Sequence, residues 1–258
     1  MVPELGLGAM DTPQSSAGEA TIRCALDAGI RFIDTARGYE GSEFLLGRAI
    51  RNREDKGYCI STKTFSRTRD GAQHEIDRSL NTLGLRAIDL YQLHDVSTMD
   101  AWEQVMRPDG ALAGLQIAKS RRLIEHIGIS SHNLDVLELA ITSGQFDTVM
   151  LEYSAFFPET KPLISLAHEL GIGIIAMRPL GGSGRMSNLR TRIASGYDGM
   201  LTASLLLRYV LSDPGVSVAI PGVRLPARIE ENVRALSAFQ PLTKYEILKC
   251  EEEAKALY

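Results

Sequence analysis

The chain has 258 residues, of which 44% are hydrophobic and 23% charged, and its formal net charge is -4. This length suits one α/β barrel, which usually has about 250 residues, or two small domains. The acidic balance argues against a nucleic acid or an anionic membrane as partner. Three widely spaced cysteines with no C-x-x-C pair give no support for a metal site, and we expect none.

Targeting and membrane-spanning segments are not predicted. The first ten residues, MVPELGLGAM, lack the basic and long apolar regions of a signal peptide. No apolar run approaches the roughly 20 residues that a transmembrane helix needs, and the segment TASLLLRYVL is interrupted by Arg208. We therefore expect a soluble, cytoplasmic protein.

Short apolar runs separated by longer helical patterns make up the chain. The predicted strands lie at 4–8, 31–35, 58–63, 88–94, 126–131, 148–153, 173–177 and 218–222. Most are continuous apolar runs, which is typical of parallel strands that are buried on both faces. The helical segments between them end at or near a glycine, as connections from helix to strand prefer. A last pattern at 242–257 predicts an extra C-terminal helix.

Regular alternation of strand and helix predicts a single (β/α)8 TIM barrel that occupies 1–258 as one domain. No linker-like composition marks a domain boundary. The alternative is an open doubly wound sheet that binds a dinucleotide. Its G-x-G-x-x-G fingerprint is not met, because GLGAMD places Asp11 at the third glycine position.

Four reactive side chains are predicted to meet at one end of this barrel. Asp34 and Lys63 stand at or near the ends of the second and third predicted strands, His94 ends the fourth, and Tyr39 lies in the loop after the second. Function in such barrels collects at the carboxyl ends of the strands. Each residue alone has a structural explanation, such as an ion pair or a core histidine. Their joint placement favours a catalytic site.

These four groups suit proton transfer to a carbonyl oxygen. A phenol has a pKa of about 10, and a nearby ammonium lowers it toward neutrality. We therefore expect Lys63 to lower the pKa of Tyr39 and Asp34 to keep Lys63 charged. A neutral His94 can donate a hydrogen bond to a substrate oxygen.

The motifs that carry these residues resemble those of the aldo-keto reductase family. AGIRFIDTARGYEGSE (28–43) is similar to its strand-two signature, with a Tyr five residues after an Asp. STK (61–63) matches its strand-three lysine, and DLYQLH (89–94) resembles its D-L-Y-x-x-H motif. IGISSHN (127–133), IPG (220–222) and RIEEN (228–232) resemble later family segments, in the family's order.

The resemblance implies an oxidoreductase that uses NADPH and reduces an aldehyde or ketone to an alcohol. By this resemblance, Tyr39 is the general acid, Lys63 and Asp34 adjust its pKa, and His94 orients the carbonyl. It also implies cofactor contacts with the nicotinamide amide, the diphosphate, the adenosine and its 2′-phosphate, from Ser130, Ser131, Leu180, Gly182, Gly222, Arg228 and Asn232. NADH is expected to be the lesser cofactor, mainly because of Arg228.

Several positions depart from the family pattern. Ser131 stands where many members have Asn, Met150 where they have Gln, Met177 where they stack a Tyr, and Gly222 where many have a Lys. The N-terminal hairpin that usually closes the barrel floor is expected to be absent. The loop after the fourth strand is expected to be short, which suits an open pocket and a bulky substrate.

Two other functions remain open at this stage. One is a cofactor-binding regulatory subunit of low turnover. The other is a redox-neutral isomerase that acts on a keto sugar with tightly bound NADP. The predicted partner is a small-molecule carbonyl substrate, and the chain is expected to act as a monomer or small homo-oligomer.

Overall fold

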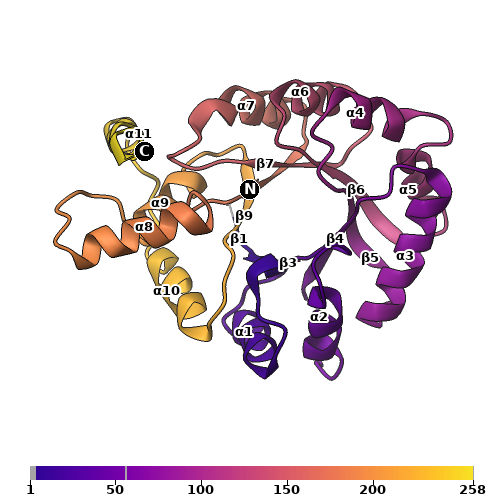
Figure 1. Ribbon diagram of the computed structural model, residues 1–258, viewed down its shortest axis with the longest axis horizontal. Helices are drawn as coiled ribbons and strands as arrows, with labels where there is room; N and C mark the ends of the chain where they lie inside the picture. Colours follow the sequence, from indigo (N-terminus) through magenta and orange to yellow (C-terminus); the bar gives the residue numbers. More distant parts are fainter. Residues whose placement is uncertain (1–3, 56, 258) are drawn as a thin grey trace.

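The computed structural model describes residues 4–55 and 57–257. Its parallel strands form a ring that is surrounded by helices (Figure 1). The strands are β1 (Glu4–Leu5), β2 (Leu7–Gly8), β3 (Phe32–Asp34), β4 (Cys59–Thr64), β5 (Ile88–Leu93), β6 (Ile124–Ser130), β7 (Thr148–Glu152), β8 (Gly173–Met177) and β9 (Val216–Ile220). The predicted strands are confirmed within two residues at each end.

Helices cover the outside of this ring. They are α1 (Ser16–Asp27), α2 (Ser42–Ile50), α3 (Arg69–Leu83), α4 (Met99–Met106), α5 (Ala111–Ser120), α6 (Leu134–Thr142), α7 (Lys161–Glu169), α8 (Gly182–Ala194), α9 (Ala203–Leu211), α10 (Pro226–Leu236) and α11 (Lys244–Leu257). Short 3-10 helices occupy Ala9–Asp11 and Pro158–Thr160. In the described part of the chain, no helix is long and apolar enough to cross a membrane.

The first strand closes the barrel by dividing its hydrogen bonds between two neighbours. β1 pairs with β9 and β2 pairs with β3, both in parallel. Gly6, between them, donates its N–H to the carbonyl oxygen of Ala219 at 2.8 Å. A Cβ at position 6 would lie 2.9 Å from Cγ2 of Ile220, so this close approach requires glycine. Residues 4–8 thus act as one strand of an eight-stranded (β/α)8 barrel, which confirms the predicted fold.

Two apolar zones fill the molecule. One lies between strands and helices and extends around the ring. The other fills the barrel interior with Leu90, Met150, Ile175, Val218 and Ile220, as expected for a barrel that is a packed core rather than a pore. Met150 therefore belongs to the floor beneath the strand ends.

The C-terminal helix was predicted correctly, but the connection after β5 was not. α11 buries Cys250 and Ala254, and Tyr209 donates a hydrogen bond to Oε1 of Glu251 at 2.7 Å. The loop after β5 was expected to be short, and it spans only 94–98 before α4 begins, but α4 and α5 in the connection to β6 were not predicted. Thr98 begins α4 by accepting a hydrogen bond from the N–H of Ala101 at 3.1 Å. The expected absence of an N-terminal hairpin concerns residues 1–3, which lie outside the described residues.

Candidate active site

Three neighbouring strands bring Asp34, Tyr39, Lys63 and His94 together at their carboxyl ends; we call these four residues the tetrad. Asp34 is the last residue of β3, Lys63 is the penultimate residue of β4, and His94 directly follows β5. β3, β4 and β5 are adjacent in the sheet. The predicted convergence is therefore present in the structure.

Lys63 lies at the centre of the tetrad. Its side chain is 0% exposed, and Nζ donates to Oδ2 of Asp34 at 2.6 Å and to the carbonyl oxygen of Thr35 at 2.8 Å. The same Nζ lies 3.4 Å from the hydroxyl oxygen of Tyr39, which accepts its hydrogen bond. One buried ammonium thus joins the carboxylate to the phenol.

Two residues outside the predicted site hold the other oxygen of Asp34. Ser61 donates to Oδ1 at 3.0 Å, and Nε2 of Gln92 lies 3.4 Å from the same atom. Gln92 also donates to Oγ of Ser61 at 2.8 Å and is 0% exposed. A glutamine inside the buried strand DLYQLH was the available signal, because buried polar side chains need partners.

Burial dominates the electrostatics of this group. It raises the pKa of the Asp34 carboxyl and lowers the pKa of the Lys63 ammonium, while the opposite charge of each partner offsets part of the shift. Burial, followed by the charge of Asp34, raises the pKa of Tyr39 above its ordinary value. The expected lowering of that pKa by Lys63 was therefore wrong for this structure, in which Tyr39 is a protonated phenol at neutral pH.

His94 is a neutral imidazole packed between two aromatic rings. Phe65 stacks on it with ring centroids 4.0 Å apart, and Tyr39 meets it edge-on at 5.4 Å. Burial, followed by the charge of Lys63, lowers the pKa of His94 to about 3. A histidine that stays neutral near pH 7 can donate a hydrogen bond without carrying charge.

This lowered pKa predicts a pH-dependent stability. Between the ordinary pKa of 6.5 and the folded value of about 3, the unfolded chain binds a proton that folded His94 does not. The stability that neutral His94 contributes is therefore complete above pH 6.5. As the pH falls from 6.5 toward 3, this contribution decreases by about 1.4 kcal/mol per pH unit. We expect urea unfolding of the wild type to lose more stability between pH 6.5 and 4 than His94→Asn does. Equal slopes for the two proteins would contradict the assignment.

A buried carboxylate holds the loop that carries Tyr39. Glu43 is 2% exposed, and its Oε1 accepts hydrogen bonds from Thr62 and Ser79, each at 2.7 Å. Its Oε2 pairs with Nη1 of Arg37, and the N–H of Arg37 donates to the carbonyl oxygen of Lys63 at 3.0 Å. The loop between Asp34 and Tyr39 is thereby tied to β4 and α3.

We expect Glu43→Gln to lower the free energy of unfolding by about 1.5–3 kcal/mol, because Arg37 loses its charged hydrogen-bond partner. The matched control is Glu75→Gln. Glu75 approaches Nε of Arg37 only at 3.8 Å and is more exposed, so its loss should cost less than about 1 kcal/mol. Equal losses of unfolding free energy in urea titrations of the two variants would show that the pair of Glu43 with Arg37 stabilises the fold no more than the pair of Glu75 with Arg37.

The residues assigned to the cofactor lie on the other side of the barrel mouth. Ser130 ends β6, and Ser131 follows it, both buried. Gly182 begins α8 at φ +84, and partly buried Leu180 precedes it. Gly222 follows β9 and bridges Gly8, and α10 carries the remaining two, Arg228 and buried Asn232. These positions span β6 to β9, whereas the tetrad spans β3 to β5.

The chemistry of these residues fits a nicotinamide adenine dinucleotide cofactor. Ser130 Oγ accepts the N–H of Asp95 at 2.9 Å, and its own proton faces only a 3.5 Å contact with the carbonyl oxygen of Leu93, so it can donate to an amide. Gly182 has a φ that favours glycine and allows close backbone approach to a phosphate. Arg228 forms an ion pair with Glu231, which Arg190 also approaches at 3.9 Å, so cations from two helices gather there.

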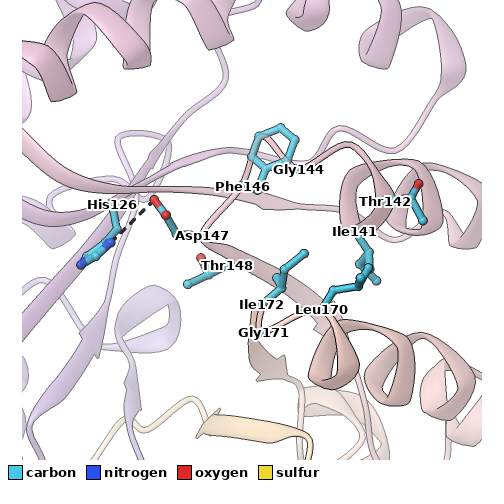
Figure 2. A pocket seen from close by; sticks show the side chains of 10 residues that line it. All are labelled: His126, Ile141, Thr142, Gly144, Phe146, Asp147, Thr148, Leu170, Gly171 and Ile172. Atoms are coloured by element: carbon cyan, nitrogen blue, oxygen red, sulfur yellow. Dashed lines mark ion pairs between the residues drawn. The ribbon is translucent and has the colours of Figure 1, made fainter.

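A cavity of about 600 Å³ lies away from this site, at the opposite end of the strands. Its lining includes Asp147 and Thr148 at the start of β7, and Gly171 and Ile172 before β8 (Figure 2). Nδ1 of His126 approaches Oδ2 of Asp147 at 3.6 Å there. That end of a TIM barrel usually serves stability. Across the described residues, no group of three or more His, Cys, Asp or Glu side chains could hold a metal ion.

Comparison with known proteins identifies the family. The model of the Aldo/keto reductase family matches residues 4–255, nearly the whole chain. The chain belongs to this family of oxidoreductases. Among curated aldo-keto reductase relatives, an aldo/keto reductase of Synechocystis is 26% identical over 91% of this chain and 80% of its own length. Morphine 6-dehydrogenase of Pseudomonas putida is 30% identical over 90% of this chain and 81% of its own.

Solved structures show the same aldo-keto reductase fold. The holo form of an aldo-keto reductase from Bacillus halodurans superposes with a TM-score of 0.81, at 24% identity, over 98% of this chain and 92% of that chain. The aldose reductase of Giardia lamblia gives a TM-score of 0.77 at 19% identity, with 98% and 92% coverage. At these identities the likeness supports the barrel alone.

Proposed function

We propose that this aldo-keto reductase reduces a small-molecule aldehyde or ketone to an alcohol with NADPH. The observation that carries the proposal is the position of Nζ of Lys63, within hydrogen-bonding distance of both Asp34 Oδ2 and the Tyr39 hydroxyl. All proposed site residues belong to one barrel, so we propose a single functional domain over 1–258. A monomer or small homo-oligomer suits this proposal.

Each member of the tetrad has a distinct part in the proposed reaction. When bound, the nicotinamide cofactor supplies the hydride. Tyr39, kept protonated by burial, donates its proton to the carbonyl oxygen as negative charge develops there. Lys63 stabilises the resulting phenolate, and neutral His94 donates a hydrogen bond that orients the carbonyl. Asp34 keeps the buried ammonium charged.

The preference for NADPH over NADH rests on the cations of α8 and α10. Arg228 lies on α10, close to Glu231, and Arg190 approaches the same carboxylate from α8. A 2′-phosphate would be attracted by these two guanidinium groups, although Glu231 competes for them. We therefore propose that NADPH is favoured and that NADH is used less well.

The test is an absorbance assay of NADPH oxidation with aldehydes, ketones and keto sugars, with NADH and the Tyr39→Phe variant in parallel. Morphine is added for the reverse reaction with NADP, because a 30% identical relative is a morphine 6-dehydrogenase. Substrate-dependent oxidation that the variant lacks would support the reductase. NADPH binding without oxidation of any substrate would contradict it and favour a regulatory subunit. Conversion of a keto sugar without net cofactor consumption would favour the redox-neutral isomerase.

A further inference from the structure

The backbone turns sharply directly after His94. Asp95 has φ +51, in the left-handed region that favours glycine and that other residues enter at a cost. Non-glycine residues in this region persist where the surrounding structure holds them, and they concentrate at functional sites. The contacts of this turn therefore show what holds it.

Arg67, in the loop after β4, donates hydrogen bonds to the carbonyl oxygens of both residues of the turn. Its Nη1 donates to the carbonyl oxygen of His94 at 2.9 Å, and its Nη2 donates to that of Asp95 at 2.8 Å. The planar guanidinium presents these two donors in a fixed geometry. Arg67 is itself anchored, because its carbonyl oxygen accepts the N–H of Ala111 at 3.0 Å and the next residue, Thr68, bridges Gly110.

The same turn contacts Ser130, the serine proposed to hold the cofactor amide. The N–H of Asp95 donates to Oγ of Ser130 at 2.9 Å, and the N–H of Val96 donates to its carbonyl oxygen at 2.8 Å. A change in the turn would therefore move the imidazole of His94 and the hydrogen-bond geometry of Ser130 together.

The loop that carries Arg67 also reaches the His94 ring. Phe65 stacks on the imidazole at 4.0 Å between centroids, with 22° between the planes. Behind Phe65 lies Gly38, where a Cβ would stand 2.5 Å from Cε2 of the phenyl ring. The ring is thus confined between the Tyr39 loop and His94, so one short loop holds both the backbone and the imidazole of His94.

We propose that Arg67 is a positioning residue that holds the left-handed turn at Asp95 and so fixes His94 for the carbonyl and Ser130 for the cofactor. The proposal rests on the proposed reductase function. It makes Arg67 act only through other residues, because its donors point at main-chain oxygens.

The kinetic test compares Arg67→Met, Asp95→Gly and the double variant in NADPH oxidation. We expect Arg67→Met to lower kcat by about 10- to 100-fold, as small misplacements of catalytic groups do. Asp95→Gly alone is the reference for the double variant: glycine adopts this φ freely and keeps the N–H that contacts Ser130, but it loses the carboxylate that accepts a hydrogen bond from Ser97. In the double variant, glycine should hold the turn without Arg67 and recover at least half of the loss on a logarithmic scale. Arg67→Lys, which keeps the charge but loses the fork, should fall between wild type and Arg67→Met.

The outcomes separate positioning from general stability. Recovery in the double variant, at equal folded content by near-ultraviolet circular dichroism, supports the proposal. An Arg67→Met protein with wild-type kcat would overturn it, as would a folded double variant without recovery. A direct effect of charge would instead leave Arg67→Lys fully active and give no rescue by glycine.

A second readout needs no turnover, so it remains decisive if the protein reduces none of the carbonyls tried. At neutral pH, the stacked Phe65 ring should shift the His94 Cε1 proton in the NMR spectrum of selectively labelled protein, with His94→Asn for assignment. We expect Arg67→Met to lose this ring-current shift and the double variant to regain it. An unchanged shift in Arg67→Met would defeat the positioning role whatever the activity of the enzyme.

Discussion

Tyr39→Phe is expected to lower kcat for carbonyl reduction by about 10²- to 10⁴-fold, the range that a positioned general acid contributes. The variant keeps the ring that meets His94 edge-on at 5.4 Å and loses only the hydroxyl that accepts a hydrogen bond from Lys63. The fold and the cofactor side of the mouth should be unaffected. NADPH affinity, measured by fluorescence titration, should therefore change little.

Tyr58→Phe is the matched control for this experiment. Tyr58 precedes β4 at the opposite end of the barrel, so loss of its hydroxyl should leave kcat unchanged. Wild-type turnover in Tyr39→Phe would remove Tyr39 from the chemistry. A parallel loss of NADPH affinity would instead indicate that the hydroxyl serves binding.

Lys63→Met is expected to abolish reduction and to lower the free energy of unfolding by about 3–5 kcal/mol, the range for removing one partner of a buried ion pair. Lys63 is 0% exposed and Asp34 is 2% exposed, so the carboxylate would be left charged and buried. The hydroxyl of Tyr39 would also lose the cation that we propose stabilises its phenolate. Urea unfolding and the NADPH assay measure the two effects separately.

This loss of stability should depend on pH with a defined sign. Without Lys63, the pKa of folded Asp34 rises further above the ordinary value of 3.8, from which burial already raises it. Such a group stabilises the fold fully below pH 3.8 and loses that contribution as pH rises through the folded pKa. The variant should therefore be least destabilised in acid. Adding Asp34→Asn to Lys63→Met should restore part of the stability but no activity; a double variant less stable than Lys63→Met would refute a buried uncompensated charge.

The strands and the convergence of the tetrad could be predicted from sequence because they depend on local patterns. Continuous apolar runs locate parallel strands, and the carboxyl ends of neighbouring parallel strands must meet. The closeness of Asp34, Lys63 and His94 follows from this rule once β3, β4 and β5 are located in the sequence. The family resemblance adds the proposed roles of these residues and the residues proposed to bind the cofactor.

The features that could not be predicted depend on how deeply a side chain is buried and on contacts between residues distant in sequence. The sign of the shift in the pKa of Tyr39 required knowing that burial outweighs Lys63. The role of Arg67 required seeing both of its amino groups on the main chain after β5. α4 was missed because its signal is a single Thr98 cap before a short amphipathic turn.

Closure of the barrel through residues 4–8 has a consequence for folding. Glu4 pairs with Val218, a separation of 218 − 4 = 214 positions. Contacts so distant in sequence slow folding, because the entropy of closing the loop is lost before the contact forms. During synthesis, β3 can pair early with β2 and β4, but residues 4–8 lack their other neighbour, and the ring cannot close until β9 leaves the ribosome. We therefore expect the nascent chain to carry an unpaired sheet edge until β9 is made, and an unpaired edge of this kind favours aggregation if translation stalls.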